Sequence, residues 1–298
     1  MAPMVSKKFV LRRNDSLDEA FRRIAANQLT RAAAALTAHD LPRERRVHEV
    51  RKRFKESRAL LRLYRFALGD AFAEQNRWYR DAGHALGAYR DATATVAAVE
   101  ALAPKLRGEI GRRAVRELLQ SVRARRDALY ADLAAIDAAF SSILAGFAAE
   151  RLRIYDVPLQ ADEETIAEGM RWTIAAERKA MNAAVDRGDA AAFHQWRKRV
   201  KDDWYQVQLF LPVWPELMGA REAALDKLSH LLGDYHDIAV VSEIAPEEAA
   251  PVLAGRQKEL AGEARPIGER LLAASPRRRA RETVALWALW QNQRPARI

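Results

Sequence analysis

Two stretches of the chain decide its fold: residues 47–55 read VHEVRKRFK, and residues 193–201 read FHQWRKRVK. Written one above the other, they share one His, two Arg and two Lys at a fixed offset of 194 − 48 = 146 residues. The same offset, applied without adjustment, places HALGAYRD at 84–91 over HLLGDYHD at 230–237. Two motifs that keep register without an insertion indicate an internal duplication of a unit of about 145 residues.

The rest of the chain indicates helices throughout. Apolar residues recur at three- and four-residue spacing, and no stretch alternates apolar and polar residues over the length of a strand. Ser16 with Glu19 predicts a capping box at the first helix, and Asp189 predicts the cap of a later one. Pro42 is expected to open a helix near 43–66, and Pro104 a long helix or a pair of helices over 104–147. Further helices are expected near 163–186, 190–211, 219–241, 247–273 and 276–291.

The predicted fold is therefore all-α, with two copies of one helical unit that arose by duplication and are related by a pseudo-twofold axis. Both repeats together are expected to make one domain. Its parts are an N-terminal arm (1–13), a first helical repeat (14–152), a linker (153–161), a second helical repeat (162–292) and a tail (293–298).

The composition excludes several classes of protein. With 49% hydrophobic and 30% charged residues, the 298-residue chain can bury a core. It has no cysteine, and therefore no disulfide framework, no cysteine zinc site and no thiol catalyst, which fits the cytoplasm. The N-terminus lacks an apolar segment of signal-peptide length. No apolar run approaches the roughly 18 residues of a membrane span, since Asp132 and Asp137 interrupt the nearest one, 130–147.

The charge indicates the kind of partner. Lys plus Arg is 50 and Asp plus Glu is 40, so the net charge is 50 − 40 = +10, and only ten of the basic residues are Lys. Arginine grips phosphate oxygens in pairs and stays charged when buried. This balance favours anionic partners and leaves nucleic acid, a membrane surface and a soluble polyanion open.

The duplicated motif arranges its cations in a row along one helix face. At 100° per residue, the members of the first row fall within about 80° of one another over about four turns. They are His48, Arg51, Lys55, Arg58 and Arg62, with Lys52 on the flank. The second row is His194, Arg197 and Lys201, with Lys198 on the flank and with Trp204 and Gln208 at the positions of Arg58 and Arg62.

Such a row is unfavourable by itself, because like charges three and four residues apart repel one another. A multivalent anion would offset the repulsion. Successive turns are roughly 5 Å apart, so an extended phosphate chain could meet a cation at about every second unit. Histidine adds a hydrogen-bonding group that is neutral or charged near physiological pH.

Plainer interpretations remain open at this point. A basic helix face is most often a solvated surface, and His48 and His194 could instead form structural hydrogen bonds that hold the two halves together. The repeated Leu-Gly-x-Tyr-x-Asp is interpreted as architectural. Its glycine would allow close helix approach, and Asp91 and Asp237 would pair with cations of the rows.

On the motif His48-x-x-Arg51-Lys52-x-x-Lys55-x-x-Arg58 and its copy from His194, each followed by Leu-Gly-x-x-x-Asp, the chain resembles the CHAD domain family (conserved histidine α-helical domain). The resemblance covers about residues 14–292. It implies an all-α fold of two four-helix bundles around a basic cavity or pore that binds inorganic polyphosphate, and association with polyphosphate granules. Many relatives carry a CYTH domain, whose Glu-x-Glu-x-Lys signature is absent from this sequence.

The resemblance implies a binding protein with no cofactor, no metal and no catalytic residue. Two alternatives are weaker: a nucleic-acid-binding protein, for which no recognised motif is present, and a metal-dependent phosphohydrolase, whose cation the surrounding Arg and Lys would repel. Oligomeric state is left open. The expected polyphosphate-binding residues are His48, Arg51, Lys52, Lys55, Arg58, Arg62, Arg90, Arg112, Arg116, His194, Arg197, Lys198, Lys201 and Arg270. Of these, Arg112, Arg116 and Arg270 rest on later helices whose register no motif fixes.

Overall fold

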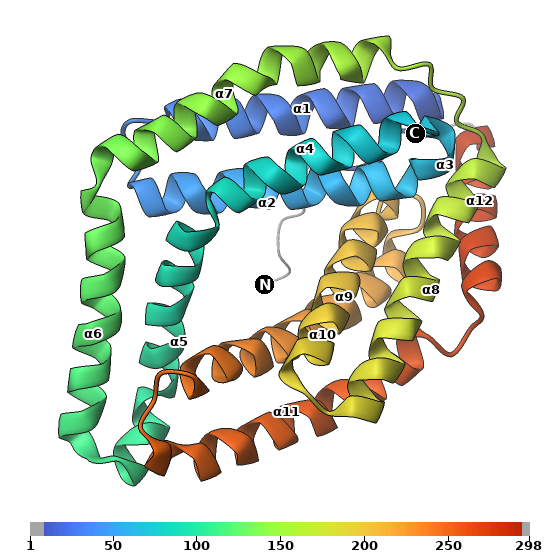
Figure 1. The fold of residues 1–298 in the computed structure, drawn as a ribbon. Helices are drawn as coiled ribbons and strands as arrows, with labels where there is room; N and C mark the ends of the chain where they lie inside the picture. Colours follow the sequence, from blue (N-terminus) through green and yellow to red (C-terminus); the bar gives the residue numbers. More distant parts are fainter. Residues whose placement is uncertain (1–8, 294–298) are drawn as a thin grey trace, which may run out of the picture.

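The computed structural model describes residues 9–293, which form helices and their connections and contain no strand (Figure 1). The all-α prediction is confirmed. The first half contains α1 (Leu17–Thr37), α2 (Arg43–Leu63), α3 (Arg65–Leu68), α4 (Ala71–Ala85), α5 (Gly87–Glu109), α6 (Gly111–Ala131) and α7 (Leu133–Asp156). The second contains α8 (Glu163–Arg187), α9 (Ala190–Phe210), α10 (Pro215–Ser242), the 3₁₀-helix η1 (Glu247–Ala249), α11 (Ala250–Leu271) and α12 (Pro276–Asn292).

The predicted helix caps are present. The backbone N–H of Glu19 donates to Ser16 Oγ at 3.2 Å, and that of Ser16 donates to Glu19 Oε2 at 2.8 Å, which completes the capping box of α1. Asp189 Oδ1 accepts from the backbone N–H of Ala192 at 2.7 Å and so caps α9.

Two predicted boundaries are wrong. Pro104 lies inside α5, and the break falls later, at Gly111, whose φ of +80° is in the left-handed region that favours glycine. Ala103 and Leu106 beside this proline are buried, so packing stabilises the helix through it. The linker predicted at 153–161 begins later, because α7 continues to Asp156.

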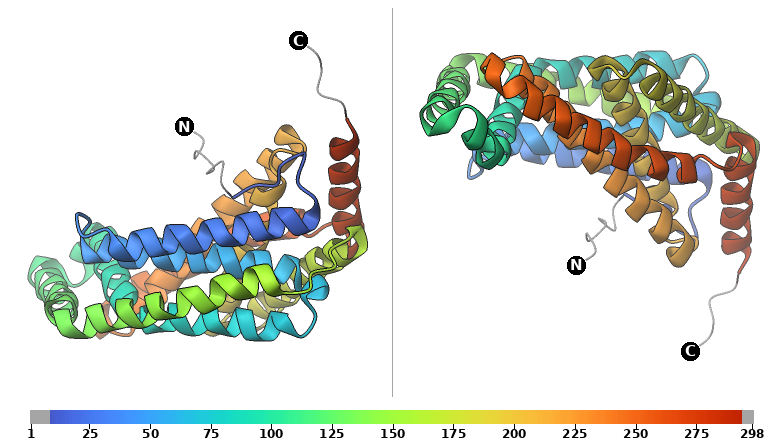
Figure 2. Two further views of the ribbon diagram at one scale, coloured as in Figure 1. Left: turned by 90° about the horizontal axis from the view of Figure 1, so that it is seen from above. Right: turned by 90° about the horizontal axis from the view of Figure 1, so that it is seen from below.

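Neighbour relations in the first half recur in the second. In the first, α1 packs on α2 and α7, α2 packs on α4, and α5 forms a hairpin with α6. In the second, α8 packs on α9 and α12, α9 packs on α10, and α10 packs on α11. Figure 2 shows the α5–α6 hairpin and α12 at opposite ends of the molecule. Each half thus builds a four-helix bundle: α1, α2, α4 and α7, or α8, α9, α10 and α12.

Helices α2 and α9 pack against each other and join the halves. Arg62 Nη1 donates to Asp202 Oδ1 at 2.9 Å, and Gln206 Nε2 donates to the carbonyl of Ala59 at 3.2 Å. Helix α8 approaches the end of α2 so closely that a Cβ on Gly169 would lie 1.9 Å from the Leu63 carbonyl oxygen. The two duplicated cation-bearing helices are therefore central in the molecule.

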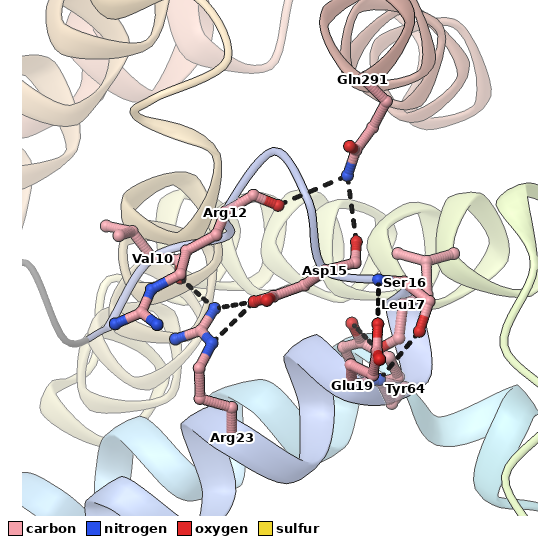
Figure 3. Close-up of polar contacts among 9 residues, drawn as sticks. All are labelled: Val10, Arg12, Asp15, Ser16, Leu17, Glu19, Arg23, Tyr64 and Gln291. Carbon is pink, nitrogen blue, oxygen red and sulfur yellow. Dashed lines mark hydrogen bonds and ion pairs between the residues drawn. The ribbon is translucent and has the colours of Figure 1, made fainter.

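The described part of the predicted arm is packed. Phe9 and Leu11 are buried, and the backbone N–H of Leu11 donates to the Leu209 carbonyl at 2.9 Å. Figure 3 shows how the following turn is held: Arg23 pairs with Asp15, Tyr64 donates to the Leu17 carbonyl, and Gln291 donates to the carbonyls of Arg12 and Asp15. Residues 1–8 of the arm and 294–298 of the tail lie outside the described residues.

Helix α7 corrects the expectation that no run approaches a membrane span. By length and composition it could cross a membrane, with a mean hydropathy of 1.4 over its best 18-residue window. Asp132 lies outside the helix as its cap, accepting from the Ala135 backbone N–H at 3.0 Å, so it does not interrupt the run. In the structure α7 packs on α1 and α4 and buries Phe140 and Phe147, as a helix of a bundle does.

Candidate anion-binding site

The two rows of cations face each other. We call Arg51, Lys55, Arg90, Arg197 and Lys201 the central cation cluster; it combines residues of α2, α5 and α9. Burial, followed by the neighbouring charges of Arg51, Arg197, Arg90 and Lys201, lowers the pKa of Lys55 to about 7. Lys55 is nevertheless exposed to solvent as a whole residue, and it lines a pocket together with Arg51 and Arg58.

Lys201 is in a related environment. Burial lowers its pKa to about 8; Arg197 and Lys52 contribute to the lowering, whereas Asp226 and Glu222 oppose it. Because Lys52 belongs to the first repeat and Arg197 to the second, cations of both halves act on Lys201. Within the described part of the chain, no member of the central cation cluster forms an ion pair.

The duplicated glycines lie against the duplicated arginines, at distances that a Cβ would meet as ordinary van der Waals contacts. A Cβ on Gly87 would lie 3.9 Å from Arg51 Nη1, and a Cβ on Gly233 would lie 3.6 Å from Arg197 Nε. Arg51 Nη1 also donates to the carbonyl of Gly83. The Nε atoms of Arg51 and Arg197 are buried without a hydrogen-bond partner among residues 9–293. Each Leu-Gly motif therefore seats one arginine and leaves a donor unused.

The motif carboxylates act at longer range than predicted. Burial lowers the pKa of both arginines. Asp91 opposes this effect at Arg51, and Asp237 opposes it at Arg197, because each carboxylate stabilises the charged guanidinium. Neither carboxylate is ion-paired with these guanidinium groups within the described residues. They reduce the charge repulsion without covering the cations.

The histidines lie at the edge of the cluster. The ring centroids of His194 and His236 lie 4.2 Å apart with the ring planes tilted by 33°, and His194 Nδ1 is buried with no hydrogen-bond partner among the described residues. Burial, followed by His236, lowers the pKa of His194 to about 4. Burial, followed by Arg90, lowers the pKa of His48. Lys55 contributes to both shifts, so it lies close to both rows. A neutral imidazole adds no charge to the cluster, and the unpartnered His194 Nδ1 is free to bond a ligand.

Arg58 and Lys198 extend the cationic surface. Arg58 Nε donates to Asn76 Oδ1 at 3.1 Å, and burial followed by the charge of Arg62 lowers its pKa to about 10. Burial lowers the pKa of Lys198, and the charge of Arg58 from the other repeat contributes to this lowering. Arg58 also lines a pocket of about 90 Å³ between α2 and α4, which we call the α2–α4 pocket.

Four of the predicted residues are placed elsewhere. Arg62 is committed to its ion pair with Asp202 at 2.9 Å, so it joins the repeats instead of facing the cluster. Arg112 and Arg116 are exposed on α6, whose packing partner is α5, and Arg270 is exposed on α11, where its Nε donates to the Pro266 carbonyl. The helical wheel could not show the partner of Arg62, which comes from a helix 140 residues away.

The structure adds two residues to the site. The His236 ring lies against that of His194, and Arg80 lines the α2–α4 pocket beside Arg58. The sequence carried a signal for His236, because the repeat offset places it at the position of Arg90. It carried none for Arg80, because only the packing of α4 on α2 brings that side chain into the pocket.

Fold and site define an all-helical protein whose two related halves share one cationic site. The model of the CHAD domain family matches residues 17–246, and the chain therefore belongs to that family. A crystal structure of the CHAD domain from the plant Ricinus communis is similar, with 19% sequence identity and a TM-score of 0.46 over 95% of this chain and 96% of that one. No curated protein matches the chain.

Proposed function

We propose that this protein binds inorganic polyphosphate through cations of both repeats and acts without catalysis. The observation that carries the proposal is the central cation cluster, whose charges have no ion-paired partner in the described part of the chain. The same helices do neutralise other cations: Arg53 pairs with Glu56 at 2.7 Å and Arg199 with Asp202 at 3.3 Å. Acids are thus present on α2 and α9 but are directed away from the cluster.

A phosphate polymer suits this arrangement better than a single phosphate. Each exposed charge contact is weak, but many contacts on one polymer share the entropic cost of binding and add up to avidity. Affinity is expected to rise with chain length and to fall with salt, because bound cations displace counterions from the polymer. Membership of the CHAD domain family supports this ligand, and association with polyphosphate granules in the cytoplasm is part of the proposal.

The test compares two charge-reversal variants of the full chain. Arg51→Glu with Arg197→Glu should abolish binding of fluorescently labelled long-chain polyphosphate while helix content, followed by circular dichroism, is kept. Arg112→Glu with Arg270→Glu makes the same charge change on exposed positions outside the site and should retain most of the affinity. Equal loss in both variants, or wild-type affinity no higher for polyphosphate than for orthophosphate, would refute the proposal.

A nucleic acid is the competing polyanion. If single- or double-stranded nucleic acid resisted displacement by polyphosphate, the cationic site would belong to a nucleic-acid-binding protein instead. A phosphohydrolase would release phosphate from polyphosphate with magnesium, in proportion to the protein added.

A further inference from the structure

The two repeats differ at one pair of equivalent positions beside the central cation cluster. In the first repeat, Arg58 Nε donates to Asn76 Oδ1 at 3.1 Å. In the second, Trp204 Nε1 donates to Glu222 Oε1 at 2.9 Å. Within each pair the two residues are 18 positions apart. The second pair lies at the repeat offset from the first, since 204 − 58 and 222 − 76 both equal 146. The contact is therefore the same contact of the duplicated unit, with its charge changed.

The neighbouring positions change charge in the same direction. Arg80 of the first repeat lines the α2–α4 pocket with Arg58, and the offset places Asp226 at its equivalent. The carboxylates of Asp226 and Glu222 both stabilise the charged form of Lys201. Glu222 is 6% exposed and accepts from both Trp204 and Gln208, so its carboxylate is fixed in place.

The adjacent charges do not cancel this difference. Asp81 pairs with Arg80 at 2.8 Å, but both side chains are exposed, so the pair is weak. Asp81 also lies outside the lining of the α2–α4 pocket. In the second repeat, the equivalent of Asp81 is Lys227, which is exposed. The exposed His230 lies 3.5 Å from Asp226 and would add charge there only when protonated.

The shape differs as well. In the first repeat, Arg51, Lys55, Arg58 and Arg80 surround an open pocket of about 90 Å³. In the second, the Lys201 amine lies 4.0 Å over the ring of Trp204, so an indole takes the place of the Arg58 guanidinium beside this lysine. A polyanion leaving the cluster meets cations on one side and carboxylates with an aromatic ring on the other.

We propose that polyphosphate bound at the central cation cluster continues in one direction only, along the α2–α4 pocket, and that Glu222 and Asp226 exclude it from the equivalent surface of the second repeat. This inference rests on the proposed function. Repulsion between a phosphate chain and these two carboxylates is what separates the two directions. A duplicated and nominally symmetric site would thereby hold its ligand asymmetrically.

The experiment neutralises matched positions in the full chain and measures affinity for tripolyphosphate and for a chain of several tens of phosphates. Arg58→Gln with Arg80→Gln should weaken binding of the long chain by about 5- to 20-fold, and that of tripolyphosphate less, because only the long chain reaches the pocket. Glu222→Gln with Asp226→Asn should strengthen long-chain binding by about 3- to 10-fold and steepen its salt dependence.

Several outcomes would overturn the one-way path. Unchanged long-chain affinity in the Glu222/Asp226 variant is one, and equal loss for both ligands in the Arg58/Arg80 variant is another. Because Glu222 is buried, Asp226→Asn alone provides a second variant on a partly exposed residue; it should still strengthen long-chain binding, and no gain in a folded protein would count against the path. Failure of the wild-type protein to bind polyphosphate would instead refute the proposed function itself.

Discussion

The imidazole rings of His194 in α9 and His236 in α10 lie 4.2 Å apart, centroid to centroid. Burial, and then this neighbour, lower the pKa of His194 from 6.5 to about 4. Between these two values the unfolded chain binds more protons at this residue than the folded chain does. The contribution of His194 to stability is therefore present above pH 6.5 and is lost as the pH falls toward 4.

The wild-type protein should accordingly lose thermal stability between about pH 7.5 and pH 5, and His194→Gln should lose less over the same interval. Melting temperatures at both pH values, measured by circular dichroism, give the comparison. His84→Gln, at an exposed position, serves as the control. Identical pH dependence in wild type and His194→Gln would show that the half-buried imidazole does not titrate as described.

Binding should take up protons near neutral pH. Lys55 and Lys201 have pKa values of about 7 and about 8 in the free protein, and a bound phosphate chain favours their charged forms. Affinity should therefore rise as the pH falls from about 8.5 to about 6.5. Lys55→Arg, which stays charged, should flatten part of this dependence. Titration calorimetry in two buffers of different ionisation enthalpy measures the protons directly, and heats independent of buffer would contradict the prediction.

The contact between α8 and α2 should tolerate no side chain at Gly169. A Cβ there would lie 1.9 Å from the Leu63 carbonyl oxygen, which is backbone and cannot rotate away. We expect Gly169→Ala to destabilise the protein by about 1–3 kcal/mol or more, since the helices must separate. Gly262→Ala in α11, where no atom lies within 4 Å, should instead stabilise by about 0.5–1 kcal/mol. Denaturant unfolding of both variants would decide, and a neutral Gly169→Ala would mean that the helices shift without cost.

A buried charge network should be essential for the second bundle. Arg279 is 2% exposed and donates to both Asp203 oxygens, and burial and then Asp203 raise the pKa of the adjacent Glu177. Arg279→Met leaves buried carboxyl groups without their cation and should lower the free energy of unfolding by about 3–5 kcal/mol.

The matched control is Arg265→Met, which breaks an exposed pair with Glu269 and should leave the unfolding midpoint almost unchanged. Protonation removes the charge of the unpaired carboxylates, so the stability lost in the Arg279→Met variant should be smaller at low pH. Urea midpoints at two pH values measure both effects; a deficit independent of pH would assign it to lost packing alone.

Much of the fold could be predicted because its signals are local. Caps such as Ser16 and Asp189 act within three residues, and helix faces follow from the 3.6-residue period. The helix start predicted at Pro104 is wrong because a proline also occurs inside a helix when burial of its neighbours outweighs its missing N–H. The family resemblance, based on motifs, is confirmed by the match over residues 17–246.

The helical character of the chain, its repeat at an offset of 146 residues and the cations that share a helix face all follow from patterns in the sequence. Three other features follow from the packing of the helices: the faces of α2 and α9 meet, Arg62 pairs with Asp202, and Arg80 joins the site while Arg112 does not. Periodicity sets the direction of a side chain around one helix axis, whereas its partner depends on which distant helices the burial of apolar surface brings together.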